Sequence, residues 1–281
     1  MIKITECPRD AMQGLKDFVP TASKIEYLQT LLNVGFDVLD FGSFVSPRAI
    51  PQLKDTTEVL EQLDLIHTQT KLLAIVASKK GGERAASFDK VSYLGFPFSF
   101  SPTFLKKNIN SDLEKVIRTT EDFQEICAKN NKILLQYISM AFGNPYGDAW
   151  SKEMLYEWID RFVNMGIEKI TLSDITAEAN PEMIFDIYHN IINQYPNIDF
   201  GIHLHTSVTK WEPLVDAAYK GGCRSFDTVL NGMGGCPMSG KELLQNLNTF
   251  DLLSYLEKNN ISNKIDQTSL KVSLEKANKI F

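Results

Sequence analysis

The 281-residue sequence is poor in the features that mark secreted, membrane-spanning or nucleic-acid-binding proteins. Its four cysteines, at positions 7, 127, 223 and 236, are too few and too scattered for a disulfide framework. No apolar run approaches the roughly 20 residues that cross a bilayer, and the N-terminal residues MIKITECPRD show no secretory signal. The net charge of −6 provides no basic face for phosphates, which argues against nucleic acid as a partner. We therefore expect a cytoplasmic protein.

The apolar residues form short β-branched runs that alternate with longer segments of helical spacing. The runs that we interpret as strands are Ile2–Thr5, Phe36–Phe41, Lys71–Ala77, Val91–Phe96, Ile133–Ser139, Lys169–Ser173, Asp199–His205 and Ser225–Leu230. The segments that we interpret as helices include 21–34, 111–130, 151–165, one that begins at Pro181, 211–220 and about 241–259. We expect serines 111 and 151 to cap two of these helices, and two glycines at 221 and 222 to end another.

Eight strand–helix units in series predict an α/β protein with a closed (β/α)8 TIM barrel. We expect a single domain over residues 1–281, with the barrel at about 1–259 and a C-terminal helical extension at about 260–281. An open doubly wound sheet is the alternative. Such a sheet would carry a G-x-G-x-x-G turn after its first strand, and the sequence there is ECPRDAMQG.

Histidine is scarce, yet two of the four histidines stand one residue apart in GIHLHTS, at positions 203 and 205. Residues i and i+2 of a strand point to the same face, so both rings are expected to project inward near the barrel mouth. There they can bind one cation, although each could instead be a hydrogen-bonded core histidine. Asp10, just past the first strand, is the expected third ligand. This donor set suits Mg²⁺ or Mn²⁺ better than structural zinc.

Other reactive residues lie near the ends of predicted strands, where the loops of a barrel build its active site. They are Arg9, Asp40 and Asp174. Arg9 either forms a salt bridge with one of these aspartates or faces negative charge that develops on an enolate oxygen. Two aspartates, 37 and 227, fall inside predicted strands and do not follow this pattern.

Cys236 lies in the loop sequence NGMGGCP, after the last predicted strand. The glycines would allow this loop to close over the barrel mouth, and a cysteine on such a lid can deliver or remove a proton. An inert loop cysteine is the alternative, and ligation of the metal by Cys236 is a third, although no C-x-x-C spacing supports it.

Several segments resemble a known family in the same order. CPRDAMQG resembles GPRDGLQ, FGSFVSPRAIPQ resembles TSFVSPKWVPQ, FLKKNINSD resembles FTKKNINCS, IHLHTS resembles VHCHDT, and NGMGGCP resembles AGLGGCP. The resemblance extends over about residues 2–256. The chain is identified as a member of the 3-hydroxy-3-methylglutaryl-CoA lyase family, within the metal-dependent barrel lyases and Claisen-condensing synthases.

The resemblance implies a divalent-metal-dependent retro-Claisen cleavage of an acyl-CoA thioester, 3-hydroxy-3-methylglutaryl-CoA, to acetyl-CoA and acetoacetate, and it suggests a homodimer. The implied metal ligands are Asp10, His203, His205 and Asn246. The implied catalytic residues are Arg9, Asp40, Cys236, Asp174 and His203, with Asp40 as the favoured base and with Asp174 and His203 as alternatives. The implied substrate contacts are Gln13, Lys16 and Asn108.

Some positions depart from the family pattern and leave the substrate open. Thr5 stands where the lyases usually carry Glu, Asp40 is one methylene shorter than the family's Glu, and Thr206 replaces an Asp. The glycine-rich approach to Asn246 is replaced by MSGKELLQN. The alternatives are a synthase that condenses acetyl-CoA with a 2-oxo acid, a lyase acting on another hydroxyacyl thioester or hydroxy-oxo acid, and a barrel that binds metal and acyl-CoA without turnover.

Overall fold

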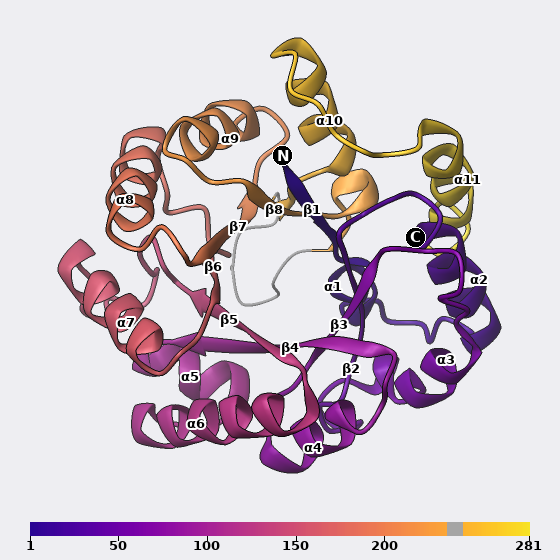
Figure 1. The fold of residues 1–281 in the computed structure, drawn as a ribbon, viewed down its shortest axis with the longest axis horizontal. Coiled ribbons are helices and arrows are strands. Elements are labelled where there is room, and N and C mark those ends of the chain that lie inside the picture. The colour runs from indigo at the N-terminus through magenta and orange to yellow at the C-terminus, as the bar shows by residue number, and fades with distance from the viewer. Residues whose placement is uncertain (235–243) are drawn as a thin grey trace.

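The computed structural model of the protein describes residues 1–234 and 244–281. Parallel strands pair in sequence from β1 to β8, and the pairing of β1 with β8 closes them into a barrel with the helices outside (Figure 1). The strands are β1 (Lys3–Glu6), β2 (Val38–Ser43), β3 (Lys71–Ile75), β4 (Val91–Ser99), β5 (Ile133–Ser139), β6 (Lys169–Asp174), β7 (Asp199–Thr206) and β8 (Ser225–Thr228). The predicted (β/α)8 barrel is therefore confirmed.

The helices that surround the barrel follow the strands in the chain. They are α1 (Pro8–Gln13), α2 (Thr21–Leu31), α3 (Thr56–Gln62), α4 (Lys79–Ala86), α5 (Pro102–Ile109), α6 (Leu113–Asn130), α7 (Lys152–Asn164), α8 (Pro181–Gln194), α9 (Trp211–Lys220), α10 (Thr249–Lys258) and α11 (Gln267–Ala277), with the short 3-10 segments η1 (Pro51–Leu53) and η2 (Leu230–Gly232). Pro181 stands at the first position of α8, as expected, and Ser151 caps α7. The cap of α6 is Asp112 rather than the expected serine at 111.

The helix expected to begin at about residue 241 was placed too early. Residues 241–243 lie outside the described part of the chain, and the short strand β9 (Gln245–Asn246) follows them, antiparallel to β7. The helix α10 begins at Thr249, because the Asn248 side chain accepts a hydrogen bond from the amide of Phe250 and caps it there. Asn246 therefore lies on a strand beside β7.

Alternation along each strand divides its side chains between two cores. On β3, Leu72 and Ala74 join the large core between the strands and the helices, whereas Leu73 and Ile75 form a separate interior cluster with Leu135 and Tyr137. Burial of an aliphatic side chain of this kind stabilises the fold by roughly 1.5–3 kcal/mol. The interior cluster also fills the middle of the barrel between its two mouths.

The predicted C-terminal extension contains α11, which packs against α2 on the outside of the barrel (Figure 1). Lys276 forms an ion pair with Glu26, and the Asp266 amide donates to the Val34 carbonyl over 2.8 Å. The last helix therefore covers the first large helix of the barrel.

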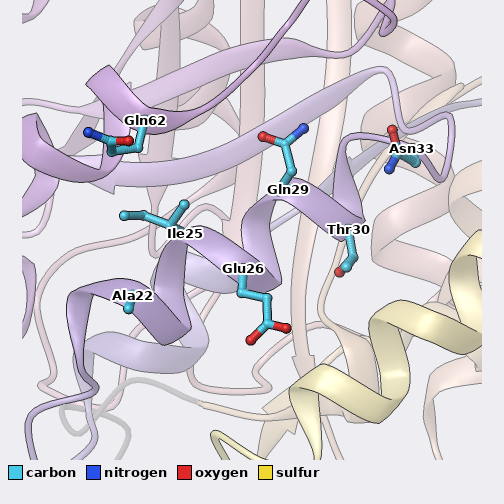
Figure 2. Close-up of a pocket in the computed structure, with 7 residues that line it drawn as sticks. All are labelled: Ala22, Ile25, Glu26, Gln29, Thr30, Asn33 and Gln62. Carbon is cyan, nitrogen blue, oxygen red and sulfur yellow. The ribbon is translucent and has the colours of Figure 1, made fainter.

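A hollow of about 450 Å³ lies along the outer face of α2, with Gln62 of α3 on its other side (Figure 2). The residues that line it include no histidine or cysteine, and its one carboxylate, Glu26, is paired with Lys276. This hollow is on the helical surface rather than at the strand ends, and it brings no reactive groups together.

Within the described part of the chain, we find no helix that combines the length and apolarity required to cross a bilayer.

Candidate active site

Three predicted metal ligands meet at the carboxyl end of the barrel. His203 and His205 project from β7, and Asp10 stands on α1, whose first residue, Pro8, has a fixed φ that suits the start of a helix directly after β1. One ligand atom from each of the three side chains lies within 4.8 Å of the others. The structure thus brings together residues that are almost 200 positions apart in the sequence.

The two histidine rings turn the same nitrogen toward each other. His203 Nε2 lies 3.2 Å from His205 Nε2, while His203 Nδ1 lies 3.2 Å from the carboxylate of Asp227 on β8. A carboxylate acceptor at Nδ1 favours the tautomer that carries its proton there. The lone pair of His203 Nε2 then faces the cluster, which is the orientation that a metal ligand requires.

The protonation states of the cluster also suit a cation. Burial and the neighbouring His203 lower the pKa of His205 to about 4, so this ring is neutral at neutral pH. Burial raises the pKa of Asp10, but the charges of Arg9 and the two histidines outweigh burial and lower it to about 2. Burial lowers the pKa of His203, but the contact with Asp227 outweighs it, and the net shift is upward. In the protonated form of His203, the second ring proton is on Nε2. A cation would compete with this second proton for the Nε2 lone pair.

Asn246 lies directly opposite His205, because β9 pairs with β7 at this position. Its Nδ2 donates to Asp10 Oδ2 and to the Met233 carbonyl, each over 2.9 Å. Its buried Oδ1 has no hydrogen-bond partner of normal geometry among the described residues, although the amide is close enough to favour the protonated form of His205. A buried acceptor without a partner is costly.

The backbone before β9 approaches this cluster closely at Gly234. Its φ is +81°, and a Cβ at this position would lie 2.9 Å from Ala11 Cα and 3.2 Å from Asn246 Nδ2. A side chain is therefore excluded on both conformational and steric grounds. The glycine allows the backbone at this position to lie against Ala11 of α1.

Arg9 is held by three partners beside the cluster. Its Nε and Nη2 donate to the carboxylate of Asp40, at 2.9 Å and 2.6 Å, and Nη1 donates to Asp10 and to Gln13. Burial acts to lower the pKa of Arg9, but the charges of Asp40 and Asp10 outweigh burial and raise it. A guanidinium has five N–H donors, so one on Nη2 has no acceptor among the described residues. The expected salt bridge with Asp40 is present, and a donor remains for a substrate oxygen.

The two other predicted carboxylates have different surroundings. Asp40 is fully buried, and burial raises its pKa to about 6 against the opposing effect of Arg9. It stands where the register of β2 against β3 shifts by one residue, an irregularity that is common beside active sites. Asp174, at the end of β6, accepts hydrogen bonds from the amides of Glu178 and Ala179. The structure does not bring Asp174 into the cluster of Asp10.

The predicted substrate contacts are divided. Gln13 lies within the site, since its Nε2 donates to Asp10 Oδ1 over 2.8 Å in addition to its contact with Arg9. Lys16, after α1, and Asn108, on α5, are exposed at the same end of the barrel and do not contact the cluster. Cys236 lies outside the described residues, so its predicted position over the mouth has no structural description.

Sequence reasoning missed three residues that surround His203. Asp227 orients its ring, Cys7 lies within 4.8 Å of His203 and Asp227, and the ring of Tyr137 packs edge-on against His203 with centroids 6.3 Å apart. All three are on barrel strands or directly after one. Asp227 carried a usable signal, because an aspartate inside an apolar strand requires a partner when it faces the interior.

Comparison with known proteins identifies the family of this chain. A family model described as HMGL-like matches residues 2–274. The chain belongs to the HMGL-like family. It is 29% identical to the mitochondrial hydroxymethylglutaryl-CoA lyase of Macaca fascicularis, over 91% of this chain and 78% of that protein. It is also 29% identical to the cytoplasmic 3-hydroxy-3-methylglutaryl-CoA lyase of Homo sapiens, over 91% of this chain and 68% of that one.

Solved structures of HMGL-like family proteins have the same fold. One is an HMG-CoA lyase from Acinetobacter baumannii in complex with coenzyme A and 3-methylmalate, with a TM-score of 0.91 and 27% identity, covering 100% of this chain and 91% of that one. The hydroxymethylglutaryl-CoA lyase of Pseudomonas aeruginosa has a TM-score of 0.90 at 23% identity, over 99% and 92% of the two chains, which supports the fold. Both curated relatives are named hydroxymethylglutaryl-CoA lyases, which are carbon–carbon lyases.

The donor set of this HMGL-like chain fits a divalent cation. Two imidazoles, a carboxylate and an amide oxygen suit a hard or borderline ion that keeps positions for substrate oxygens. The observation that favours a cation is the buried Asn246 Oδ1, which has no hydrogen-bond partner of normal geometry among the described residues and lies beside two facing imidazole nitrogens. A cation among these atoms would satisfy all of them.

Proposed function

We propose that this protein catalyses the divalent-metal-dependent retro-Claisen cleavage of 3-hydroxy-3-methylglutaryl-CoA to acetoacetate and acetyl-CoA. The observation that carries the proposal is the cluster of Asp10, His203 and His205, with the side-chain amide of Asn246 beside it. The substrate is taken from the names of the relatives, which are hydroxymethylglutaryl-CoA lyases. The homodimer and the cytoplasmic location expected from the sequence stay predictions.

Mg²⁺ or Mn²⁺ bound by these four side chains would polarise the substrate's tertiary hydroxyl and a neighbouring oxygen, which lowers the pKa of that hydroxyl. The chain's own contribution is the orientation of the ligands. Asp227 holds the His203 ring through Nδ1, and β9 holds Asn246 against β7. Such supporting contacts commonly determine how well a metal site works.

Asp40 is the proposed base for the hydroxyl proton. A pKa raised to about 6 by burial leaves the carboxylate ionised at neutral pH and basic enough to accept a proton. Its Oδ1 accepts only the longer bond from Arg9 Nε, at 3.2 Å, and so retains a lone pair for the substrate. Protonation of Asp40 would also weaken its ion pair with Arg9.

Arg9 is the proposed electrostatic partner of the product enolate. When the carbon–carbon bond breaks, negative charge moves onto the thioester oxygen of the acetyl-CoA fragment. The remaining N–H of Arg9 Nη2 can donate to that oxygen, and the fixed positive charge needs no reorganisation because Asp40, Asp10 and Gln13 already hold it. Cys236 is proposed to help protonate the enolate carbon.

A second candidate is cleavage of a different 3-hydroxyacyl thioester or hydroxy-oxo acid. The specific feature that favours it is Thr206, beside the proposed ligand His205, whose hydroxyl donates to the Ser207 carbonyl where the lyase pattern has a carboxylate. A substitution next to a metal ligand changes the side chains that contact the substrate, although the metal ligands themselves stay the same.

The experiment is to incubate the purified protein with Mn²⁺ and 3-hydroxy-3-methylglutaryl-CoA and to measure acetoacetate. The proposal expects metal-dependent product, lost in Asp10→Ala and His205→Ala. Product formation from a different 3-hydroxyacyl thioester or from a hydroxy-oxo acid, but not from this substrate, would favour the second candidate. A synthase would instead consume acetyl-CoA with a 2-oxo acid, and absence of turnover with every substrate would favour a non-catalytic barrel.

A further inference from the structure

A second cavity lies at the opposite mouth of the barrel, where the strands begin. Its volume is about 220 Å³. Lys3, Lys71 and Lys169 stand at the first positions of β1, β3 and β6, and all three line it. The interior cluster that includes Leu73, Ile75 and Tyr137 fills the barrel between this cavity and the metal ligands.

The charges around this cavity do not balance. Four lysines line it, the fourth being Lys264 from the connection between α10 and α11, against two aspartates. Lys264 pairs with Asp37 over 2.7 Å. Lys3 and Lys169 share one oxygen of Asp199. Lys71 has no carboxylate within ion-pair distance in the described part of the chain, so the cavity carries an excess of two positive charges.

Polar groups also line the cavity below the lysines. TIM barrels usually fill their interior with bulky branched side chains, but inward positions here carry Thr5, Thr171 and Gly201. The two threonines are only 5% and 3% exposed, and both line the cavity. A Cβ at Gly201 would lie 2.7 Å from Thr171 Oγ1, so the glycine leaves this hydroxyl accessible.

These features indicate both the charge and the size of a ligand. Ammonium groups and hydroxyls both donate hydrogen bonds to anionic oxygens, and such charge-assisted bonds are the stronger class. Ligand pockets for drug-sized molecules span roughly 300–1,000 Å³, so a cavity of 220 Å³ admits a smaller ion. A small dianion would neutralise the excess charge.

We propose that the N-terminal mouth of the barrel binds a small dianion, either phosphate or a short dicarboxylate, on Lys3, Lys71 and Lys169 and on the hydroxyls of Thr5 and Thr171. The ligand would connect the starts of β1, β3 and β6. Because it binds the closed barrel and not the unfolded chain, it stabilises the folded protein. This site is independent of the lyase proposal.

The test is isothermal titration calorimetry of the Mg²⁺-loaded protein at low ionic strength. Inorganic phosphate is the titrant in one experiment and malonate in another. We expect saturable binding of one anion per chain to at least one of the two, and the preferred anion identifies the source. Lys71→Met removes a cation without breaking an ion pair, and Thr171→Val removes a buried hydroxyl at nearly constant volume. Each is expected to weaken binding, Lys71→Met by about tenfold or more.

Two controls separate this site from others. Lys80→Met removes an exposed lysine on α4 and should leave the affinity unchanged. Asp10→Ala alters the proposed metal site and should also leave it unchanged, which distinguishes binding here from binding to a cation at the other mouth. Absence of saturable binding for both anions, or equal affinity in the wild type and Lys71→Met, would overturn the proposal whatever the lyase assay gives.

Discussion

His203 Nδ1 lies 3.2 Å from Asp227 Oδ2, and this contact decides which nitrogen of the ring faces Asp10 and His205. The carboxylate comes from β8, the strand next to β7. Two adjacent strands therefore cooperate, one providing the ligand and the other fixing its tautomer.

Asp227→Asn is expected to lower the affinity for Mn²⁺ by about 10- to 100-fold, the usual cost of losing a partner that orients a metal ligand. The change removes the negative charge at Nδ1 and permits the other tautomer. Titration of free Mn²⁺ by electron paramagnetic resonance would measure it. Asp216→Asn on α9 is the matched control, and equal affinity in both variants would show that Asp227 does not orient the ring.

Asn246→Asp is expected to make folding more dependent on metal. The substitution replaces the Nδ2 donor, 2.9 Å from Asp10 Oδ2, with a second carboxylate oxygen, and two like charges repel at that distance. Without metal, the melting temperature should fall. Added Mn²⁺ should raise it by more than it does in the wild type, because a cation neutralises both carboxylates. An equal metal-induced shift in the two proteins would contradict a role for Asn246 as a ligand.

Asp40→Asn is expected to reduce kcat by roughly 10²- to 10⁴-fold, the range that general base catalysis contributes. In the wild type, the rate should fall as pH decreases through about 6, since burial raises the pKa of Asp40 to that value and a protonated carboxyl cannot accept a proton. Asp40→Glu retains the carboxylate and should keep most of the activity. A pH–rate profile of Asp40→Asn that keeps the wild-type rate and acid limb would assign the base elsewhere.

Glu6 is expected to make stability fall with rising pH. It is fully buried and accepts hydrogen bonds from Leu230 N, Thr249 Oγ1 and Thr228 Oγ1, yet burial raises its pKa from 4.5 to about 7. The folded state then binds the proton more tightly than the unfolded state. The contribution of Glu6 to the free energy of unfolding is complete below pH 4.5 and is lost as pH rises to about 7. The total loss is up to about 3 kcal/mol.

Denaturant unfolding of the wild type and Glu6→Gln at several pH values would measure this effect. The uncharged glutamine keeps the shape of the side chain but does not titrate. The difference in unfolding free energy between the two proteins should therefore shift in favour of Glu6→Gln between pH 4.5 and 7. Parallel pH profiles would mean that Glu6 does not titrate as described.

Much of the fold follows from local patterns. The strand Ile133–Ser139 and the helix Trp211–Lys220 have the predicted bounds. An apolar, β-branched run predicts the strand, and the glycines that follow Lys220 predict the end of the helix, so both signals are local. The segment before α10 did not follow from such signals. Gln245 and Asn246 form a strand because β7 lies beside them, and their partners Thr206 and His205 are 39 and 41 residues away in the sequence.

The candidate site was predicted in part for the same reason. His203 and His205 stand two apart, so a strand places them together whatever surrounds it. The contact of Asp227 with His203 depends on the register of β8 against β7, and the double hydrogen bond of Arg9 to Asp40 depends on how α1 lies over β2. Neither arrangement is encoded by spacing within one segment.

The most direct test of the account is a crystal structure of the protein grown with Mn²⁺, with anomalous diffraction data that locate the ion. The account predicts one Mn²⁺ bound by Asp10, His203, His205 and the Oδ1 of Asn246, and no ion at this position in His205→Ala. An ion bound elsewhere, or none at saturating Mn²⁺, would contradict it.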